Sequence, residues 1–174
     1  DTHFNELVSL PHNNYDFKIA ARRLKHYVNR AKEIFKVYDI DNVLIAITGD
    51  LINSDRRLDE MLNMSTNRSK AVFLAVDLLQ QVIFDIGQDY SVTVACVTGN
   101  ESRLKQDWGW SDFMASDNYD FMIFEILRHF FKKTNVQFVV DDPTECVVNV
   151  AGQNLLLLHG NGSFTTQYEK SVNQ

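Results

Sequence analysis

The sequence predicts an α/β protein in which helices lie outside the β-sheets, and three observations lead to this fold class. Segments with helical spacing alternate with short, β-branched apolar segments, and a cluster of strand-like segments follows them. The 174 residues are 45% hydrophobic and 23% charged, enough apolar material for one domain with a substantial core. The chain contains no repeat, low-complexity tract or linker, so we expect a single domain over residues 1–174.

Three segments have the three- and four-residue apolar spacing of a helix that is buried on one face. The first covers residues 15–38 and carries basic side chains on its other positions, which a solvated face would explain without a ligand. The second covers residues 71–86. The third, residues 119–133 with Asp117 or Asn118 as N-cap, is apolar nearly all round. Either both of its faces are covered within the domain, or one contacts a protein partner or a second copy.

Two apolar, β-branched runs predict buried strands of a mostly parallel sheet. They cover residues 42–48 and 91–98, and Gly49 and Gly99 end them. The polar residues between the first of these strands and the second helix predict a loop with a short helix. The remaining strands are expected at residues 136–140, 146–150 and 154–158.

Charge and cysteine content restrict the function classes. The 17 Lys and Arg against 23 Asp and Glu give a formal charge of −6, which repels polyanions unless positive charge is concentrated locally or supplied by a metal. No apolar run approaches the roughly 20 residues of a membrane-spanning helix, so we expect no membrane partner. Cys96 and Cys146 lie in strand-like runs, typical of small buried side chains in a reducing compartment, and we expect a cytoplasmic protein.

Side chains that bind metals follow the ends of the predicted strands. Ligands collect beyond the carboxyl ends of strands in open α/β sheets, so we expect these side chains to converge on one site. Their oxygen and nitrogen donors suit Mn²⁺, Zn²⁺ or Fe. Each motif alone is common, as a turn or as a structural histidine. The motifs are Asp1-Thr2-His3, Gly49-Asp50, Gly99-Asn100-Glu101 and His159-Gly160.

In this order, the motifs resemble the D-x-H, G-D, G-N-H and lone-H motifs of the calcineurin-like metallophosphoesterases, a superfamily of phosphatases, phosphodiesterases and DNA nucleases. The resemblance implies two stacked mixed β-sheets flanked by helices, a four-layer sandwich. It also implies two divalent cations, with Mn²⁺ expected and Mg²⁺, Zn²⁺ or Fe as alternatives. Asp1 and His3 would bind one cation, Asp50 would bridge both, and Asn100 and His159 would bind the second.

Three departures from the family pattern affect this interpretation. No G-H-x-H motif occurs, so we expect its two ligands, and a strand before Asp1, to lie outside this sequence, leaving the domain incomplete at both ends. Glu101 stands where the family has a phosphate-contacting His; with a raised pKa it would serve as general acid, and Arg103 would supply the missing positive charge. Asn53 replaces a common acidic residue, and we assign no consequence to this change.

The expected activity is phosphoester hydrolysis by a metal-activated water, with Asp50, Glu101 and Arg103 as catalytic residues. The segment Gly-Asn-Glu-Ser-Arg followed by Trp-Gly-Trp is most similar to phage-encoded members grouped with DNases. DNA is the expected substrate, held by Arg56, Arg103, Trp108 and Trp110. The two tryptophans would equally well form a hydrophobic lid. The alternatives are a small-molecule or cyclic-nucleotide phosphodiesterase or phosphatase, an inactive scaffold that binds a partner through helix 119–133, and an α/β domain with accidental motif matches.

Overall fold

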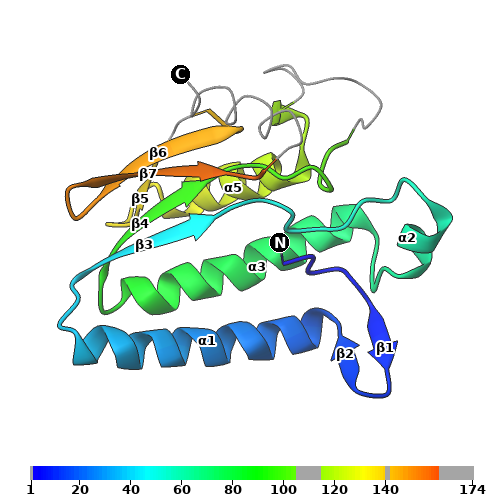
Figure 1. Ribbon diagram of the computed structural model, residues 1–174, viewed down its shortest axis with the longest axis horizontal. Helices are drawn as coiled ribbons and strands as arrows, with labels where there is room; N and C mark the ends of the chain where they lie inside the picture. Colours follow the sequence, from blue (N-terminus) through cyan, green and yellow to red (C-terminus); the bar gives the residue numbers. More distant parts are fainter. Residues whose placement is uncertain (1, 105–114, 140–141, 161–174) are drawn as a thin grey trace, which may run out of the picture.

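The computed structural model describes residues 2–104, 115–139 and 142–160, and its central layer is a three-stranded parallel sheet (Figure 1). The strand order is β3 (Asn42–Ile47), β4 (Ser91–Cys96) and β5 (Gln137–Phe138). β3 and β4 pair in parallel over six residues each, from Asn42 opposite Ser91 to Ile47 opposite Cys96. Because the two strands are in this register, their carboxyl ends lie side by side.

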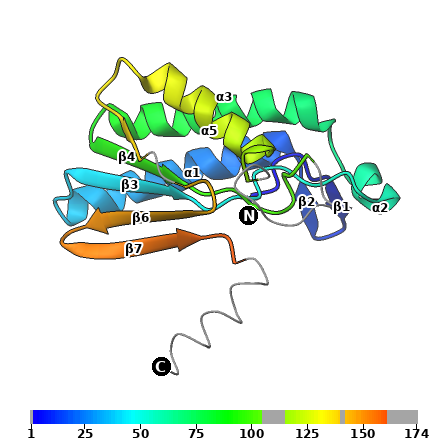
Figure 2. The same ribbon diagram turned by 90° about the horizontal axis from the view of Figure 1, so that it is seen from above.

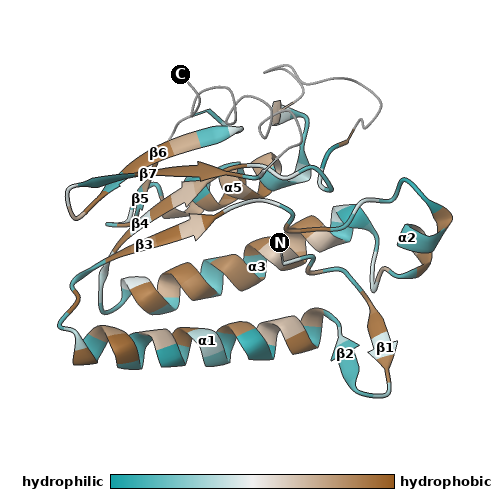
Figure 3. Cartoon of the chain, in the orientation of Figure 1, coloured by the Kyte–Doolittle hydropathy of each residue, from teal (hydrophilic) through white to brown (hydrophobic). Residues whose placement is uncertain are grey.

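Three helices cover one face of this sheet, as the two views show together (Figure 1 and Figure 2). They are α1 (Phe17–Val37), α3 (Arg68–Gly87) and α5 (Tyr119–Phe131), and their bounds agree with the predicted helices to within three residues. Brown apolar and teal polar stretches alternate along α1 in Figure 3, as expected for a helix buried on one face only. Ile83 of α3, Ile123 and Leu127 of α5 and Val94 of β4 are fully buried in the shared core.

An antiparallel hairpin covers the opposite face of the parallel sheet (Figure 2). It consists of β6 (Glu145–Val150) and β7 (Gln153–Leu158), joined at Ala151-Gly152, where both residues have a positive φ. Cys146 and Val148 pack against Ala95 and Val97 in a second, smaller core. Cys96 and Cys146 are free thiols, half-buried and buried respectively, as their strand-like surroundings predicted.

The remaining elements lie near the carboxyl ends of β3 and β4 (Figure 1). α2 (Leu58–Leu62) is the short helix expected after β3. The antiparallel hairpin of β1 (Val8–Leu10) and β2 (Asn13–Tyr15) was not predicted; these strands are only three residues long, too short for a clear alternation of apolar and polar residues. None of the helices in the described ranges combines the length and apolarity needed to cross a bilayer. The structure confirms a mixed α/β protein with stacked parallel and antiparallel sheets.

Candidate functional site

The two loops that leave β3 and β4 are in direct backbone contact. Gly49 has a φ of +87°, and a Cβ atom built on it would lie 2.3 Å from the backbone nitrogen of Gly99. A Cβ atom built on Gly99 would lie 2.0 Å from Oδ1 of Asp50. Both distances are far below van der Waals contact, so neither glycine has room for a side chain. The two glycines therefore let the residues that follow them, Asp50 and Asn100, share one small site.

Three of the predicted ligands meet at this point. Nε2 of His159, which follows β7, lies 3.0 Å from Oδ1 of Asn100 and 3.1 Å from Oδ2 of Asp50. The side chains of His159 and Asp50 are only 8% and 7% exposed. Asp50 adopts a left-handed backbone, with φ of +50°, that L-residues rarely occupy. The ends of three strands from two sheets thus bring two oxygens and one nitrogen together.

These three polar atoms have no proton donor among them unless His159 is doubly protonated. Nδ1 of His159 lies 2.6 Å from the carbonyl oxygen of Thr48, which can only accept, so Nδ1 carries a proton. The amide nitrogen of Asn100 donates to Oε1 of Glu101 at 2.8 Å, which turns Oδ1 of Asn100 toward the histidine. Nε2 therefore faces two acceptors, and either a second proton or a cation must lie between them.

The charges of the pair favour the proton when no cation is bound. The hydrogen bond with Asp50 is the largest influence on His159 and raises its pKa above 6.5, against the opposing effect of burial. Burial alone would raise the pKa of Asp50, but hydrogen bonds from His159 and from the backbone N–H of Glu101 bring it below 3.8. Between pH 3.8 and 6.5, the site therefore holds the carboxylate of Asp50 beside the imidazolium of His159.

The same donor set fits a divalent cation. Adjacent ligands at about 2.1 Å from an octahedral metal ion lie about 3 Å apart, and the two donor pairs here, at 3.0 and 3.1 Å, have that separation as well as the separation of a hydrogen bond. Carboxylate, amide oxygen and imidazole suit Mn²⁺, Zn²⁺ or Fe. No group of three or more His, Cys, Asp and Glu side chains is arranged to hold a metal among residues 2–104, 115–139 and 142–160. The third donor in this cluster is the amide of Asn100.

The other two predicted ligands belong to the first three residues. The backbone N–H groups of Thr2 and His3 donate to the carbonyl oxygen of Asp50 at 3.1 and 3.0 Å, which places this segment beside the β3 loop. His3 has a φ of +44°, and its charge contributes to the lowered pKa of Asp50. Asp1 lies outside the described residues, so its predicted role as a ligand remains a prediction.

Glu101 and Arg56 form an ion pair at the edge of the site, with 2.6 Å between Oε1 and Nη2. Burial raises the pKa of Glu101, but the hydrogen bonds from Arg56 and Ser54 outweigh it, and the net pKa is lowered. The raised pKa that a general acid requires is therefore not found at Glu101 in this arrangement. Burial lowers the pKa of Arg103, and the charges of Asp50 and Glu101 act on Arg103 in the opposite direction. Asp50 and Arg56 thus lie close enough to Glu101 and Arg103 to shift the pKa values of both.

The aromatic part of the predicted site lies outside the described residues. Trp108 and Trp110 belong to residues 105–114, so base stacking and a hydrophobic lid both stay predictions.

The predicted third helix, α5, has one covered face and one exposed face: Ile123 and Leu127 are fully buried, whereas Phe130 is 53% exposed.

Three buried residues hold the two loops, a role that sequence reasoning did not assign to them, although it named Asn118 as a candidate N-cap. Arg68, at the start of α3, donates to the backbone carbonyls of Glu101 and Arg103 at 2.9 Å each. Asn118, the N-cap of α5, donates to the carbonyl of Gly99 at 2.9 Å, and Asp120 accepts from backbone N–H groups of both loops. A cap and an acidic residue in the first turn are usual at helix N-termini, so Asn118 and Asp120 carried no distinguishing signal.

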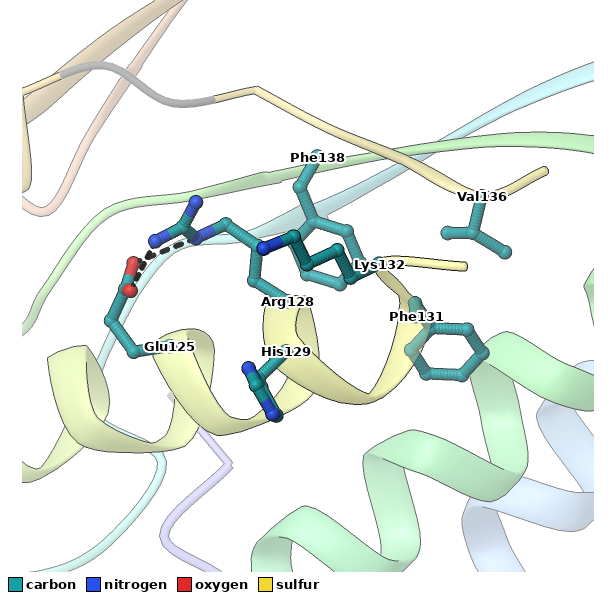
Figure 4. A pocket seen from close by; sticks show the side chains of 7 residues that line it. All are labelled: Glu125, Arg128, His129, Phe131, Lys132, Val136 and Phe138. Atoms are coloured by element: carbon teal, nitrogen blue, oxygen red, sulfur yellow. Dashed lines mark hydrogen bonds and ion pairs between the residues drawn. The ribbon is translucent and has the colours of Figure 1, made fainter. Parts of the chain in front are cut away.

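A separate pocket of about 310 Å³ lies at the other end of α5 (Figure 4). Arg128 lines this pocket beside Lys132, but its Nε and Nη2 already donate to the carboxylate of Glu125. None of the predicted site residues lines this pocket. The convergence of predicted ligands at the strand ends is therefore the more informative feature.

No protein-family model, curated protein or solved structure matches this chain. What the site does must therefore be inferred from its own residues and geometry.

Proposed function

We propose that this chain is a metal-dependent phosphoester hydrolase of the calcineurin-like metallophosphoesterase type and that it cleaves DNA phosphodiesters. The observation that carries the proposal is that Nε2 of His159 lies within 3.1 Å of oxygens of both Asp50 and Asn100, at the ends of three strands. Chain order and strand-end placement of these residues follow the family's motif pattern. Under this proposal, the stacked parallel and antiparallel sheets with helices on one side are part of a four-layer sandwich.

Asp50, Asn100 and His159 would hold one divalent cation, and Asp1 and His3, with Asp50 between them, would hold a second. When bound, two cations, Mn²⁺ in the first instance, would lower the pKa of a water and neutralise the charge of a phosphate. The cations would also offset the formal charge of −6, which otherwise opposes a polyanionic substrate.

The chain's own groups orient the donors and the substrate. The carbonyl of Thr48 keeps the Nδ1 proton of His159 in place, which leaves Nε2 as the ligand atom when the second proton is lost. Arg56 and Arg103 supply the positive charge that a phosphate needs. Glu101, ionised by its pairing with Arg56, orients that guanidinium in the free protein. We therefore assign Glu101 to substrate positioning through Arg56, with proton donation to the leaving group as its alternative role.

The choice of DNA rests on the arginines at the site and on the predicted stacking residues Trp108 and Trp110. Small phosphodiesters or cyclic nucleotides require only the metal centre and one arginine. An inactive scaffold requires neither, and would use the exposed side of α5 near Phe130 to bind a partner. These alternatives differ in the substrate that is turned over.

The deciding experiment is hydrolysis of bis-p-nitrophenyl phosphate, single-stranded DNA and double-stranded DNA by the full-length protein, with Mn²⁺ and with EDTA. Asp50→Asn should reduce Mn²⁺-dependent cleavage at least 100-fold, because it removes a ligand charge without changing the size of the side chain. Asp59→Asn removes an exposed carboxylate of α2 and serves as the matched control, with unchanged activity.

Metal-dependent cleavage of both the small ester and DNA would support the nuclease. Cleavage of the small ester alone would support a small-molecule phosphodiesterase instead. Undiminished cleavage by Asp50→Asn, or an inert wild-type protein under every metal, would contradict the proposed enzyme.

A further inference from the structure

The carboxylate of Asp120 connects the two loops that carry the candidate ligands. Its Oδ2 accepts from the backbone N–H of Asp50 at 2.8 Å and from that of Gly99 at 2.9 Å, and its Oδ1 accepts from Leu51 at 3.1 Å. The hydroxyl of Ser102 is a further partner. One side chain of α5 thus binds the loop after β3 and the loop after β4 at the same time.

This carboxylate occupies a place where a carboxylate is costly. Asp120 is fully buried, and both its burial and the nearby charge of Asp50 disfavour its ionised form. An apolar residue would avoid that cost, but it would leave the three backbone N–H groups unpaired in the interior. The N–H groups converge because the glycine contact forces the two loops together. An acidic residue suits the first turn of a helix, but the burial of Asp120 and its bonds to three loop N–H groups are explained by the loops.

The backbone that Asp120 holds is the strained part of the site. Asp50 has a φ of +50°, follows Gly49 at +87°, and directs Oδ1 to the backbone N–H of Glu101 at 2.8 Å. Such a conformation persists only where its surroundings enforce it. A hydrogen bond to the N–H of Asp50 itself, and another to the next residue, Leu51, supply that enforcement.

We propose that Asp120 is a positioning residue of the metal site, which acts by holding the backbone of Asp50 and Gly99 so that Asp50 and Asn100 both face His159. This inference rests on the proposed function, because the geometry that Asp120 preserves is that of the candidate ligands. Asp120 itself touches neither metal nor substrate in this role.

The test is Asp120→Asn in the full-length protein, with Glu125→Gln as the matched control on the exposed side of the same helix. Asparagine keeps the size of the side chain, but its N–H₂ group cannot accept a hydrogen bond from the backbone N–H groups that now donate to Asp120. We expect the Mn²⁺ affinity, measured by calorimetry and by the Mn²⁺ EPR signal, to fall about 10- to 100-fold, as for other groups that orient metal ligands. Glu125→Gln should retain wild-type affinity.

Hydrogen exchange of the Asp50, Leu51 and Gly99 amides provides a readout that needs no metal. These amides should exchange at least 10-fold faster in Asp120→Asn than in the wild type, while amides in the middle of β4 stay protected. If Asp120→Asn does not fold, Asn118→Ser replaces it. Serine still caps α5 but loses the bond to the Gly99 carbonyl, and a smaller loss of Mn²⁺ affinity is expected.

A folded Asp120→Asn variant with lower thermal stability but wild-type Mn²⁺ affinity and turnover would overturn the inference and leave Asp120 a structural residue. Unchanged amide exchange would overturn it as well. Absence of Mn²⁺ binding and turnover in the wild type is a different result: it contradicts the proposed function, and the amide exchange then decides the role of Asp120 in loop geometry by itself.

Discussion

The carboxyl end of the parallel sheet and its helix-covered face bury different kinds of side chain. Between α1, α3 and α5 and the sheet, the fully buried side chains are apolar, as at Ile83, Ile123 and Leu127. At the carboxyl end, polar and charged side chains are buried in the loops and in the helix starts that contact them. In the described part of the chain, these buried polar residues are Asn5, Asp50, Ser54, Arg68, Thr98, Ser102, Asn118 and Asp120.

The difference separates stability from function. Apolar burial is non-directional and favours folding in proportion to the area removed from water. Buried polar groups contribute little net stability, but their directional hydrogen bonds hold the groups that they join in one arrangement. We expect substitutions in the helix-facing core to cost stability, and substitutions at the sheet end to cost activity out of proportion to stability.

The largest stability effect is expected from Leu127→Ala in the core. Removing this fully buried side chain should lower the free energy of unfolding by about 2–5 kcal/mol. Phe130→Ala on the same helix, where the ring is 53% exposed, should change it by less than about 1 kcal/mol. Urea denaturation measures both, and the folded fraction of Leu127→Ala should retain wild-type activity. A larger cost at Phe130 would show that its exposed face is covered in the whole protein.

Gly99→Ala should damage the site more than the fold. A methyl group would lie 2.0 Å from Oδ1 of Asp50, so the loop must shift, at a cost of about 1–3 kcal/mol. Gly152→Ala, in the β6–β7 turn, has open space around it but a φ of +84°, and should cost a comparable 1–2 kcal/mol, roughly the penalty of a left-handed backbone. Only Gly99→Ala should lose Mn²⁺-dependent turnover. Equal activity of the two variants would show that the close approach of Gly49 and Gly99 is not needed for turnover.

The Asp50–His159 pair should make stability depend on pH in the absence of metal. The pKa of His159 is raised above 6.5 in the folded state, so its contribution is complete below pH 6.5 and is lost as pH rises through the folded value. The pKa of Asp50 is lowered below 3.8, so its contribution is present above pH 3.8 and is lost as pH falls through the folded value. Urea midpoints measured between pH 3 and 9 should show both limbs, and His159→Gln should flatten the upper one. An unchanged upper limb in that variant would exclude the pair as its source.

The smallest stability effect is expected from Arg56→Gln, since the pair with Glu101 is partly exposed and such pairs are worth less than about 1 kcal/mol. Its activity effect is more informative. The variant removes the strongest interaction that lowers the pKa of Glu101, so that pKa should rise, and the KM for a phosphodiester should increase. Arg57→Gln, which removes the fully exposed neighbour paired with Glu60, is the control. A kcat/KM pH profile that is identical in both variants would exclude a titrating Glu101 from the reaction.

The sequence alone determined the local elements and the positions of the ligands along them. Apolar periodicity predicted the three long helices and the strands β3, β4, β6 and β7, because burial of one face imposes a period that can be seen in any single segment. The placement of Asp50, Asn100 and His159 after strands, together with the glycines before two of them, predicted that they would meet. The structure confirms that they do: β3 and β4 end in register at one edge of the parallel sheet, and His159, after β7 of the antiparallel hairpin, reaches the same point.

Only the tertiary structure decided how the site is held. Asp120 lies 70 residues from Asp50 and 21 from Gly99 along the chain, and its bonds to both depend on how α5 packs on the sheet. Likewise the pairing of Arg56 with Glu101 reverses the pKa direction that a buried carboxyl suggests. Hydrogen bonds act over about 3 Å and depend on direction. The sequence around a carboxylate therefore does not indicate which distant residues will donate to it.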